Sequence, residues 1–379
     1  MVIGKCLETP EKIRSLQKKL YLKAKAEPDY RFYLLYDKVW REDILDHAYK
    51  VARANAGAPG VDGVCFADIE AAGVQEWLSG IRKSLRERTY RPDPVRRVMI
   101  PKPNGGERPL GIPTIRDRVV QTAVKLVVEP IFEADLEPNA YGYRPKRSAI
   151  DAVKAVLAGL RSGHTDVVDA DLSKYFDTIP HDQLMRSVAR RIVDKDILRL
   201  IKMWLKAPIE ETDKDGRKRL TGGKRHKWGT PQGGVISPLL ANLYMNRFLK
   251  HWRLTEQGRK LKARVIAYAD DFVILSRGYA EQAEEWTRET MLRLGLSLNE
   301  TKTCVRDARK ERFDFLGYSF GLHYSPRNGQ RYLGASPSRK SVTRFKPRIG
   351  AILQVSEKGS LAGRLRRAQP HAGRLGTLL

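Results

Sequence analysis

The stretch Ala267-Tyr268-Ala269-Asp270-Asp271-Phe272 sets two adjacent carboxylates between two apolar runs. Arg264-Val265-Ile266 precedes it and Val273-Ile274-Leu275 follows, and β-rich runs on either side of a short polar break predict a hairpin. The two aspartates then lie at or beside its turn, where they are costly unless something cationic binds them. An exposed Asp-Asp turn without a ligand is the alternative, and the hexapeptide alone does not separate the two.

A second pair of carboxylates lies about a hundred residues earlier, in Asp166-Val-Val-Asp-Ala-Asp171. The alternation of this run predicts a strand, and its period of two puts Asp169 and Asp171 on the same face. Such a pair is again expensive without a cation. The chain therefore has two separate places where a positively charged ligand would fit.

The composition favours a polyanionic partner. The chain of 379 residues has 71 Lys and Arg against 44 Asp and Glu, a formal net charge of +27, and the basic residues are spread along its whole length. A broad positive surface points to nucleic acid, although any single basic run by itself is better explained as a solvated face. A hydrophobic content of 41% suffices for a folded core. No run approaches the roughly 20 apolar residues of a membrane span, so no membrane partner is expected.

The three cysteines, Cys6, Cys65 and Cys304, lie far apart and have no paired spacing. Neither a disulfide framework nor a zinc module is therefore indicated. The first residues contain no long apolar core of the kind that a signal peptide needs. These features are typical of a protein of the reducing cytosol.

Apolar periodicity predicts several helices and one further hairpin. Helical patterns cover residues 10–26, 31–51, 116–132 and 180–205, an exposed hairpin or loop covers 210–227, and Ser237-Pro238 begins another helix. The helix at 10–26 is strongly basic. Its cations either line an RNA or template surface or serve only for solubility.

Two short basic segments are candidate ligand sites. In residues 98–113, Lys102 and Arg108 flank a Pro-Asn-Gly-Gly turn, and a hairpin would let both converge on an anion such as a triphosphate. The loop Tyr141-Gly-Tyr-Arg-Pro-Lys-Arg147 interleaves aromatic and basic residues, as surfaces that stack on and neutralise a nucleic acid strand do. The candidate nucleic-acid contacts in that loop are Tyr141, Tyr143, Arg144, Lys146 and Arg147. A basic tip without a ligand, and tyrosines that only pack, are the alternatives.

Taken together, these segments resemble the reverse transcriptases encoded by group II introns. Seven blocks occur in the order that this family shows, over about residues 10 to 350. They are Ile100-Pro-Lys-Pro-Asn-Gly-Gly-Glu-Arg-Pro-Leu-Gly-Ile-Pro113, Tyr141-Gly-Tyr-Arg-Pro145, Asp169-Ala-Asp-Leu-Ser-Lys-Tyr-Phe-Asp177, Gly229-Thr-Pro-Gln-Gly-Gly-Val-Ile-Ser-Pro238, Tyr268-Ala-Asp-Asp271, Leu294-Gly-Leu-Ser-Leu-Asn-Glu-Thr-Lys302 and Phe315-Leu-Gly-Tyr-Ser319. One such block is weak support, whereas seven in order are strong.

The resemblance implies an α+β fold, that of a right-hand polymerase with a ferredoxin-like palm. Residues 1–90 would form an N-terminal helical extension and the start of the fingers, and 91–165 the fingers. Residues 166–335 would form the palm with the catalytic hairpin, and 336–379 an incomplete thumb or maturase region. In such a palm the strand that bears Asp171 lies beside the hairpin that bears Asp270 and Asp271.

The resemblance also implies a chemistry and its site residues. Asp171, Asp270 and Asp271 would be the catalytic carboxylates and would bind Mg²⁺ for two-metal phosphoryl transfer. Asp171 is preferred over Asp169 because the family's ligand lies five residues before the aromatic that contacts the sugar, here Phe176. The other residues of the nucleotide site would be Lys102, Arg108, Gln232 and Lys302. The implied partners are an RNA template with its primer, deoxynucleoside triphosphates and a group II intron RNA.

The sequence departs from the family pattern after the palm. No His/Cys nuclease module follows, and the expected thumb helix near residues 338–352 contains Pro347, which predicts a break. Because Gly359 to Leu379 has no periodicity, a thumb lost by truncation or a frameshift is expected. Two alternative functions stay open: a maturase that acts mainly as an RNA-binding splicing cofactor, and another bacterial reverse transcriptase of the retron or defence type.

Overall fold

A computed structural model describes residues 7–101, 105–213, 215, 217–223 and 226–354 of this mixed α/β protein. The chain forms two compact units: the first takes residues 1–138 and 174–248, the second 139–173 and 249–379. Each unit is thus made from two separate parts of the sequence. Across the described ranges, no helix has both the length and the apolar character needed to span a bilayer.

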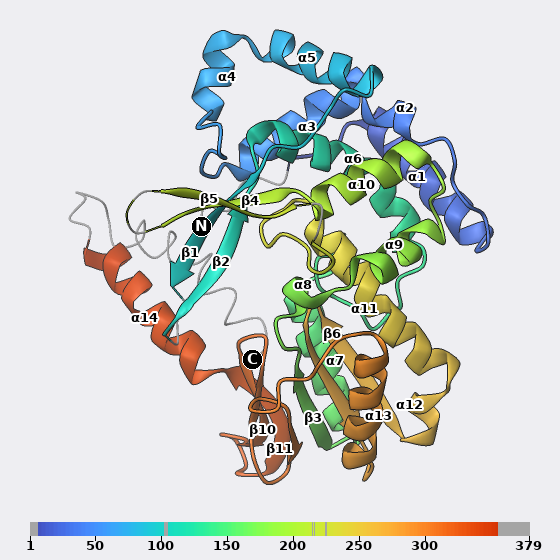
Figure 1. Ribbon diagram of the computed structural model, residues 1–379. Helices are drawn as coiled ribbons and strands as arrows, with labels where there is room; N and C mark the ends of the chain where they lie inside the picture. The colour runs from blue at the N-terminus through green and yellow to red at the C-terminus, as the bar shows by residue number, and fades with distance from the viewer. Residues whose placement is uncertain (1–6, 102–104, 214, 216, 224–225, 355–379) are drawn as a thin grey trace. The chain divides into compact units, whose positions relative to one another are not determined.

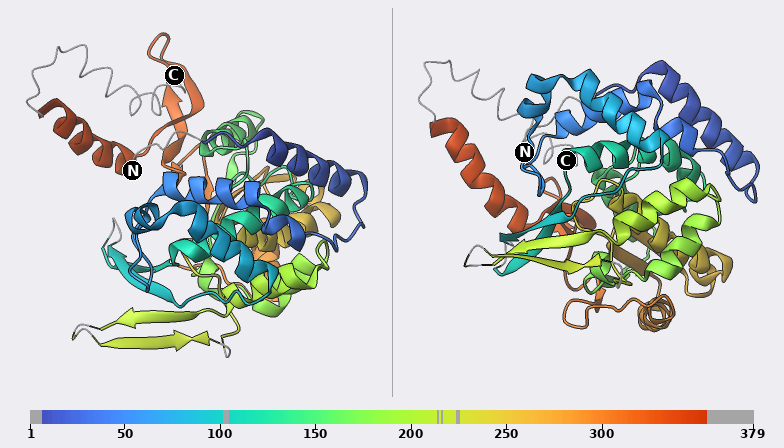
Figure 2. Two further views of the ribbon diagram at one scale, coloured as in Figure 1. Left: turned by 90° about the horizontal axis from the view of Figure 1, so that it is seen from above. Right: turned by 45° about the horizontal axis from the view of Figure 1, so that its top comes forward.

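The first unit combines a helical part with a four-stranded sheet. Within it, α1 and α3 pack against α6, whose side chains are mostly buried. The strands follow the order β2-β1-β4-β5, and Figure 2 shows the β4–β5 hairpin beside β1 and β2. The elements are α1 (Glu11–Ala26), α2 (Tyr36–Val39), α3 (Glu42–Asn55), α4 (Phe66–Ala72), α5 (Val74–Arg86), β1 (Val95–Pro101), β2 (Glu107–Ile112), α6 (Ile115–Glu133), α8 (Tyr175–Thr178), α9 (His181–Ala189), α10 (Lys195–Leu205), β4 (Pro208–Thr212), β5 (Lys218–Gly222) and α11 (Ser237–Leu254), which continues into the second unit.

Two of the expected helices are interrupted, and one buried carboxylate binds backbone groups of both segments. Asp194 caps α10 by accepting from the backbone N–H groups at the start of that helix, so the pattern at 180–205 divides into α9 and α10. Its other oxygen accepts from the backbone of Leu35 and Tyr36, at 2.8 Å each. Phe32 is bridged to Ile192 as extended backbone, so the expectation of a helix from residue 31 is wrong.

The second unit is built on a four-stranded antiparallel sheet in the order β6-β7-β3-β8, with a three-stranded antiparallel sheet, β11-β10-β9, beside it (Figure 1). The strand β3 is central although it precedes its neighbour β7 by about a hundred residues. The elements are α7 (Ala149–Arg161), β3 (Asp166–Asp171), α12 (Gln257–Lys260), β6 (Ala263–Tyr268), β7 (Asp271–Ser276), α13 (Ala280–Arg293), β8 (Cys304–Asp307), β9 (Phe313–Phe315), β10 (Tyr318–Tyr324), β11 (Arg331–Pro337) and α14 (Arg339–Gln354).

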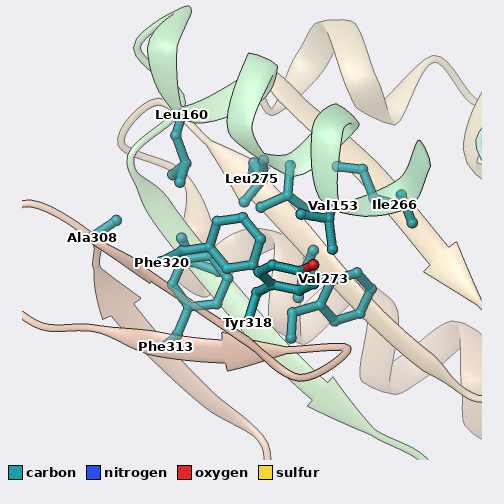
Figure 3. Close-up of a cluster of buried hydrophobic side chains, with 13 residues drawn as sticks. Val153, Leu160, Ile266, Val273, Leu275, Ala308, Phe313, Tyr318 and Phe320 are labelled. Carbon is teal, nitrogen blue, oxygen red and sulfur yellow. The ribbon is translucent and has the colours of Figure 1, made fainter. Parts of the chain in front are cut away.

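The core of the second unit lies on one face of the four-stranded sheet. Figure 3 shows side chains of α7, such as Val153, packed with Val273 from β7 and with the aromatic rings of the smaller sheet. Phe313 and Phe320 stack there with their ring centroids 5.2 Å apart. Val167 belongs to this core, and strand alternation puts Asp169 and Asp171 on its face of β3. One end of this face is therefore packed and the other carries carboxylates.

The helix α14 runs from Arg339 to Gln354 and includes Pro347, so the expected break at that proline is wrong. A proline removes one backbone hydrogen bond, but neighbouring turns can continue the helix at some cost. Residues 355–379, including the segment expected to lack periodicity, lie outside the described residues.

Candidate active site

Asp171 and Asp271 lie directly opposite each other on the paired strands β3 and β7. Asp270 is in the two-residue turn that joins β6 to β7, closed by the pairing of Tyr268 with Asp271. The expected neighbourhood of the Asp171 strand and the Asp-Asp hairpin is confirmed by this pairing. Asp169 is one step further into the sheet on the same face, opposite Val273.

The turn has an unusual backbone that a neighbouring glycine supports. Ala269 has a φ of 59°, a left-handed conformation that costs a non-glycine residue about 1 kcal/mol. A Cβ on Gly142 would lie 2.4 Å from the backbone nitrogen of Ala269, so only glycine fits there. The backbone of Tyr141 donates to the Ala267 carbonyl at 2.8 Å, which holds the 139–143 segment along β6. Gly142 lies between two tyrosines in the sequence, a position that gave no signal of this contact.

Two side chains from the segment before β8 bind the Asp171 carboxylate. Lys302 Nζ lies 2.9 Å from Oδ2 of Asp171, and Asn299 Nδ2 donates to the same oxygen at 3.1 Å. The Asn299 backbone N–H also donates to the Asp171 carbonyl at 2.8 Å. The hydrogen bond from Lys302 to Asp171 is the main reason why the pKa of that ammonium is raised. Lys302 thus lies at the carboxylates, and Asn299 is a site residue that the sequence analysis missed.

The carboxylates disfavour their own ionisation. Protein atoms around Asp271, and then the charges of Asp270 and Asp171, raise its pKa to about 6. Because this residue is still exposed at the surface, the shift reflects crowding and like charge rather than full exclusion of water. Burial also raises the pKa of Asp270, and that of Asp169 to about 6, the latter against the opposing charge of Arg306. A cation at this end of the sheet would relieve these costs.

The donor set fits a hard divalent cation. Carboxylate oxygens are the ligands that Mg²⁺ prefers, and Asp171, Asp270 and Asp271 offer them at one end of the sheet. As the side chains stand, no three His, Cys, Asp or Glu groups of the described residues are gathered closely enough to hold one ion. Lys302 supplies the neutralising charge beside Asp171 instead. A metal would therefore compete with this ammonium.

The loop of residues 141–147 contains both exposed and buried members. Tyr143 is half exposed, with its ring centroid 6.4 Å from that of Tyr268, and Lys146 is exposed. Arg144 is buried and donates to the Ala140 carbonyl at 2.8 Å. Arg147 donates to the same carbonyl and lies 5.3 Å above the ring of Tyr141. Arg144 and Arg147 thus stabilise the loop in this structure, and contacts of the five residues with nucleic acid stay predictions.

The first unit brings together other residues named from the sequence. Gln232 Nε2 donates to the Asp177 carboxylate at 3.2 Å, and the Thr230 N–H donates to the Phe176 carbonyl at 2.6 Å. The Gln232 carbonyl in turn accepts from the N–H of Gly111 in β2. Gln232 and Asp177 line a cavity of about 360 Å³. Asp177 had no role assigned from the sequence.

The remaining two residues belong to the β1–β2 hairpin. Arg108 is exposed in β2 and pairs with Ile100 of β1, which confirms the expected hairpin. Lys102 lies outside the described residues. Whether the two converge on an anion stays a prediction.

Comparison with known proteins assigns the chain to a family. The family model for reverse transcriptase (RNA-dependent DNA polymerase) matches residues 100–320, more than half of the chain. Protein YkfC of Escherichia coli is 34% identical over 90% of this chain and 96% of its own length. The group II intron-encoded protein LtrA of Lactococcus lactis is 31% identical over 78% of this chain, but the match spans only 57% of LtrA. Nuclear intron maturase 2 of Arabidopsis thaliana is 25% identical over 37% of this chain and 23% of its own length.

Proposed function

The chain belongs to the reverse transcriptase family, and we propose that it is an RNA-directed DNA polymerase that extends a primer on an RNA template. The observation that carries the proposal is the direct pairing of Asp171 with Asp271, with Asp270 in the adjoining turn. An RNA-binding protein without catalytic activity has no need of three crowded carboxylates, which cost stability. The sheet order β6-β7-β3-β8 supports identifying the second-unit sheet as the palm.

The proposed site residues act by binding and positioning. Asp171, Asp270 and Asp271 would hold Mg²⁺, which when bound supplies Lewis-acid chemistry at the primer 3′-hydroxyl and at the pyrophosphate leaving group. Asn299 fixes the orientation of the Asp171 carboxylate through its hydrogen bond. The ammonium of Lys302 is placed to neutralise charge near the carboxylates. By the family resemblance, Arg108 and Lys102 would bind the triphosphate and Phe176 would exclude a ribose 2′-hydroxyl.

The nucleotide-facing role of Gln232 rests on its fixed orientation. Its side-chain amide donates to Asp177 and its backbone is bonded to Gly111, so the loop of residues 229–234 is held on two sides. By the family resemblance this glutamine would lie along the nascent base pair.

We propose that a group II intron RNA is the natural template, by analogy with the intron-encoded relative.

A maturase-like protein that assists splicing with little polymerisation is the second candidate, favoured by the similarity to an intron maturase. The experiment that separates the two uses the purified chain with a DNA primer on an RNA template, deoxynucleotides and Mg²⁺. The proposal predicts primer extension that stops when a chelator removes the metal. RNA binding without any extension under these conditions would favour the maturase.

A further inference from the structure

A second cavity of the first unit has no part in the proposed chemistry. It encloses about 770 Å³ between α9, α10 and residues 226–227. Five of its lining residues are cationic and one is acidic: Lys195, Arg199, Lys202, Lys206 and Lys227 against Asp182. Its volume lies within the range of pockets that bind small molecules or single groups of a larger ligand.

The positive charge of this cavity is mostly not neutralised by the protein. Within the described part of the chain, Lys195, Lys202 and Lys227 form no ion pair with a carboxylate, and all three are exposed. Asp182 is itself 3.8 Å from Arg186, a neighbour on the same helix. Several cations around one hollow attract an anion with more than one oxygen, such as a phosphate.

The remaining lining is apolar and aromatic, which a free inorganic anion would not use. Met185, Leu198 and Leu205 contribute aliphatic surface, and the rings of His181 and His226 meet edge to face with centroids 5.6 Å apart. Trp228, directly after the lining residue Lys227, is 54% exposed. Cations combined with flat apolar surface suit a phosphate attached to a nucleobase.

A hydrogen bond to the backbone fixes the ring of His181. Its Nε2 lies 2.6 Å from the Gly229 carbonyl, which can only accept, so Nε2 carries a hydrogen. Burial lowers the pKa of this imidazole, and its ring packs edge to face on that of His226. The histidine surface is thus held in place as part of the cavity wall.

We propose that this cavity binds one unpaired nucleotide of an RNA strand, with its phosphates on the lysines and its base against the aliphatic and histidine surface. The choice of RNA among polyanions rests on the proposed function. His226 and Leu205 also line the Gln232 cavity, so this cavity and the Gln232 cavity share a wall. The bound strand would be held beside, and not within, the proposed nucleotide site.

The test measures fluorescence anisotropy of a labelled single-stranded RNA of about 12 nucleotides on the full chain at fixed salt, with duplex RNA and AMP as competitors. Leu198→Trp fills the cavity without changing charge, and Leu292→Trp, at an exposed position of α13, is its control. The proposal predicts about tenfold weaker single-strand binding for Leu198→Trp only, and no more than about twofold loss for duplex RNA.

A charge pair makes the test independent of how Leu198→Trp folds. Lys195→Gln with Lys202→Gln is compared with Lys83→Gln and Lys154→Gln, exposed lysines of α5 and α7 that remove the same charge. Selective loss in the cavity pair supports the proposal, whereas equal loss in both pairs, or equal loss for duplex RNA, overturns it. AMP that competes as well as the strand also overturns it in favour of a free-nucleotide site. The selective loss of single-stranded RNA binding in the cavity variants should also be found in an Asp271→Asn background. Failure of the polymerase proposal can therefore be told apart from failure of this one.

Discussion

Lys302 holds its ammonium 2.9 Å from Oδ2 of Asp171, so one member of the Asp171–Asp271 pair is neutralised by a cation from the chain itself. At the other member, crowding and the charges of neighbouring carboxylates outweigh the charge of Lys302, and the pKa is raised to about 6. The two carboxylates thus differ in readiness to bind a metal. A divalent ion at Asp171 must displace Lys302 or share the carboxylate with it. At Asp271 the same ion would relieve the repulsion between carboxylates.

Removing this competing cation should strengthen metal binding. Lys302→Met leaves Asp171 without its ion pair, and we expect Mn²⁺, used as a spectroscopic substitute for Mg²⁺, to bind several-fold more tightly by electron paramagnetic resonance. The matched control is Lys310→Met. Lys310 is exposed, and its ammonium lies 3.9 Å from the carboxylate of Asp307, which is not one of the three proposed metal ligands. Affinity that is unchanged or weaker in Lys302→Met would mean that the ammonium does not compete with the ion.

Gly142 should be essential for the shape of the catalytic turn. In Gly142→Ala the new methyl group would meet the Ala269 backbone at 2.4 Å, so the turn that carries Asp270 must move. We expect primer extension to fall at least about tenfold with the fold retained, because small displacements of catalytic groups are costly. Gly80→Ala, in a helix with open space around it, is the control and should keep wild-type activity. Full activity of Gly142→Ala would show that the turn tolerates the shift.

Much of this site was predictable from local pattern. The alternation around Asp270 and Asp271 gave the hairpin, and the period of two gave the shared face of Asp169 and Asp171. The pairing of β3 with β7 came only from the family resemblance, since no local signal connects strands a hundred residues apart. Asn299 was missed because its contact depends on the bridge between Leu172 and Leu298, which the sequence does not indicate.

The predictions of continuous helices at 31–51 and 180–205 were wrong for a related reason. Periodicity at 31–51 and 180–205 is genuine, but the buried Asp194 accepts hydrogen bonds from backbone N–H groups of both segments. A single carboxylate that satisfies several backbone donors outweighs the weak helical preference of the residues near it. From the sequence alone, Arg144 was likewise expected to be a surface cation. In the folded loop it is buried and donates a hydrogen bond to the backbone.

Asp117 should make stability depend on pH. It is 1% exposed in the first unit, and burial raises its pKa to about 6 although Tyr90 and the Asp93 N–H donate to it. The folded protein then binds more protons than the unfolded chain between about pH 4 and pH 6, so this group's contribution to stability is lost as pH rises through that window. In urea unfolding, the difference in free energy of unfolding between wild type and Asp117→Asn should change by up to about 3 kcal/mol from pH 4 to pH 7. Asp29→Asn, an exposed control, should give a curve parallel to wild type, and a parallel curve for Asp117→Asn would refute the assignment.

Phe176 is predicted to select deoxynucleotides. If its ring excludes the 2′-hydroxyl by contact, Phe176→Ala should raise the kcat/KM for ribonucleotides relative to deoxynucleotides at least about tenfold. Tyr175→Phe is the control, because it keeps an aromatic ring at the neighbouring position, where the ring centroid lies 5.7 Å from that of Phe176. It should leave this ratio unchanged. An unaltered ratio in Phe176→Ala would move the role to another residue.

The most direct test of the account is single-nucleotide addition to a DNA primer on an RNA template by Asp271→Asn, compared with wild type at equal RNA occupancy. The carboxylate pair of Asp171 and Asp271 is proposed to hold the catalytic metal, so the rate should fall at least about 1,000-fold while RNA binding stays within about twofold. Asp29→Asn makes the same chemical change at an exposed position and should add nucleotides at the wild-type rate. Addition by Asp271→Asn within about tenfold of wild type would contradict the assignment of this pair as the catalytic centre.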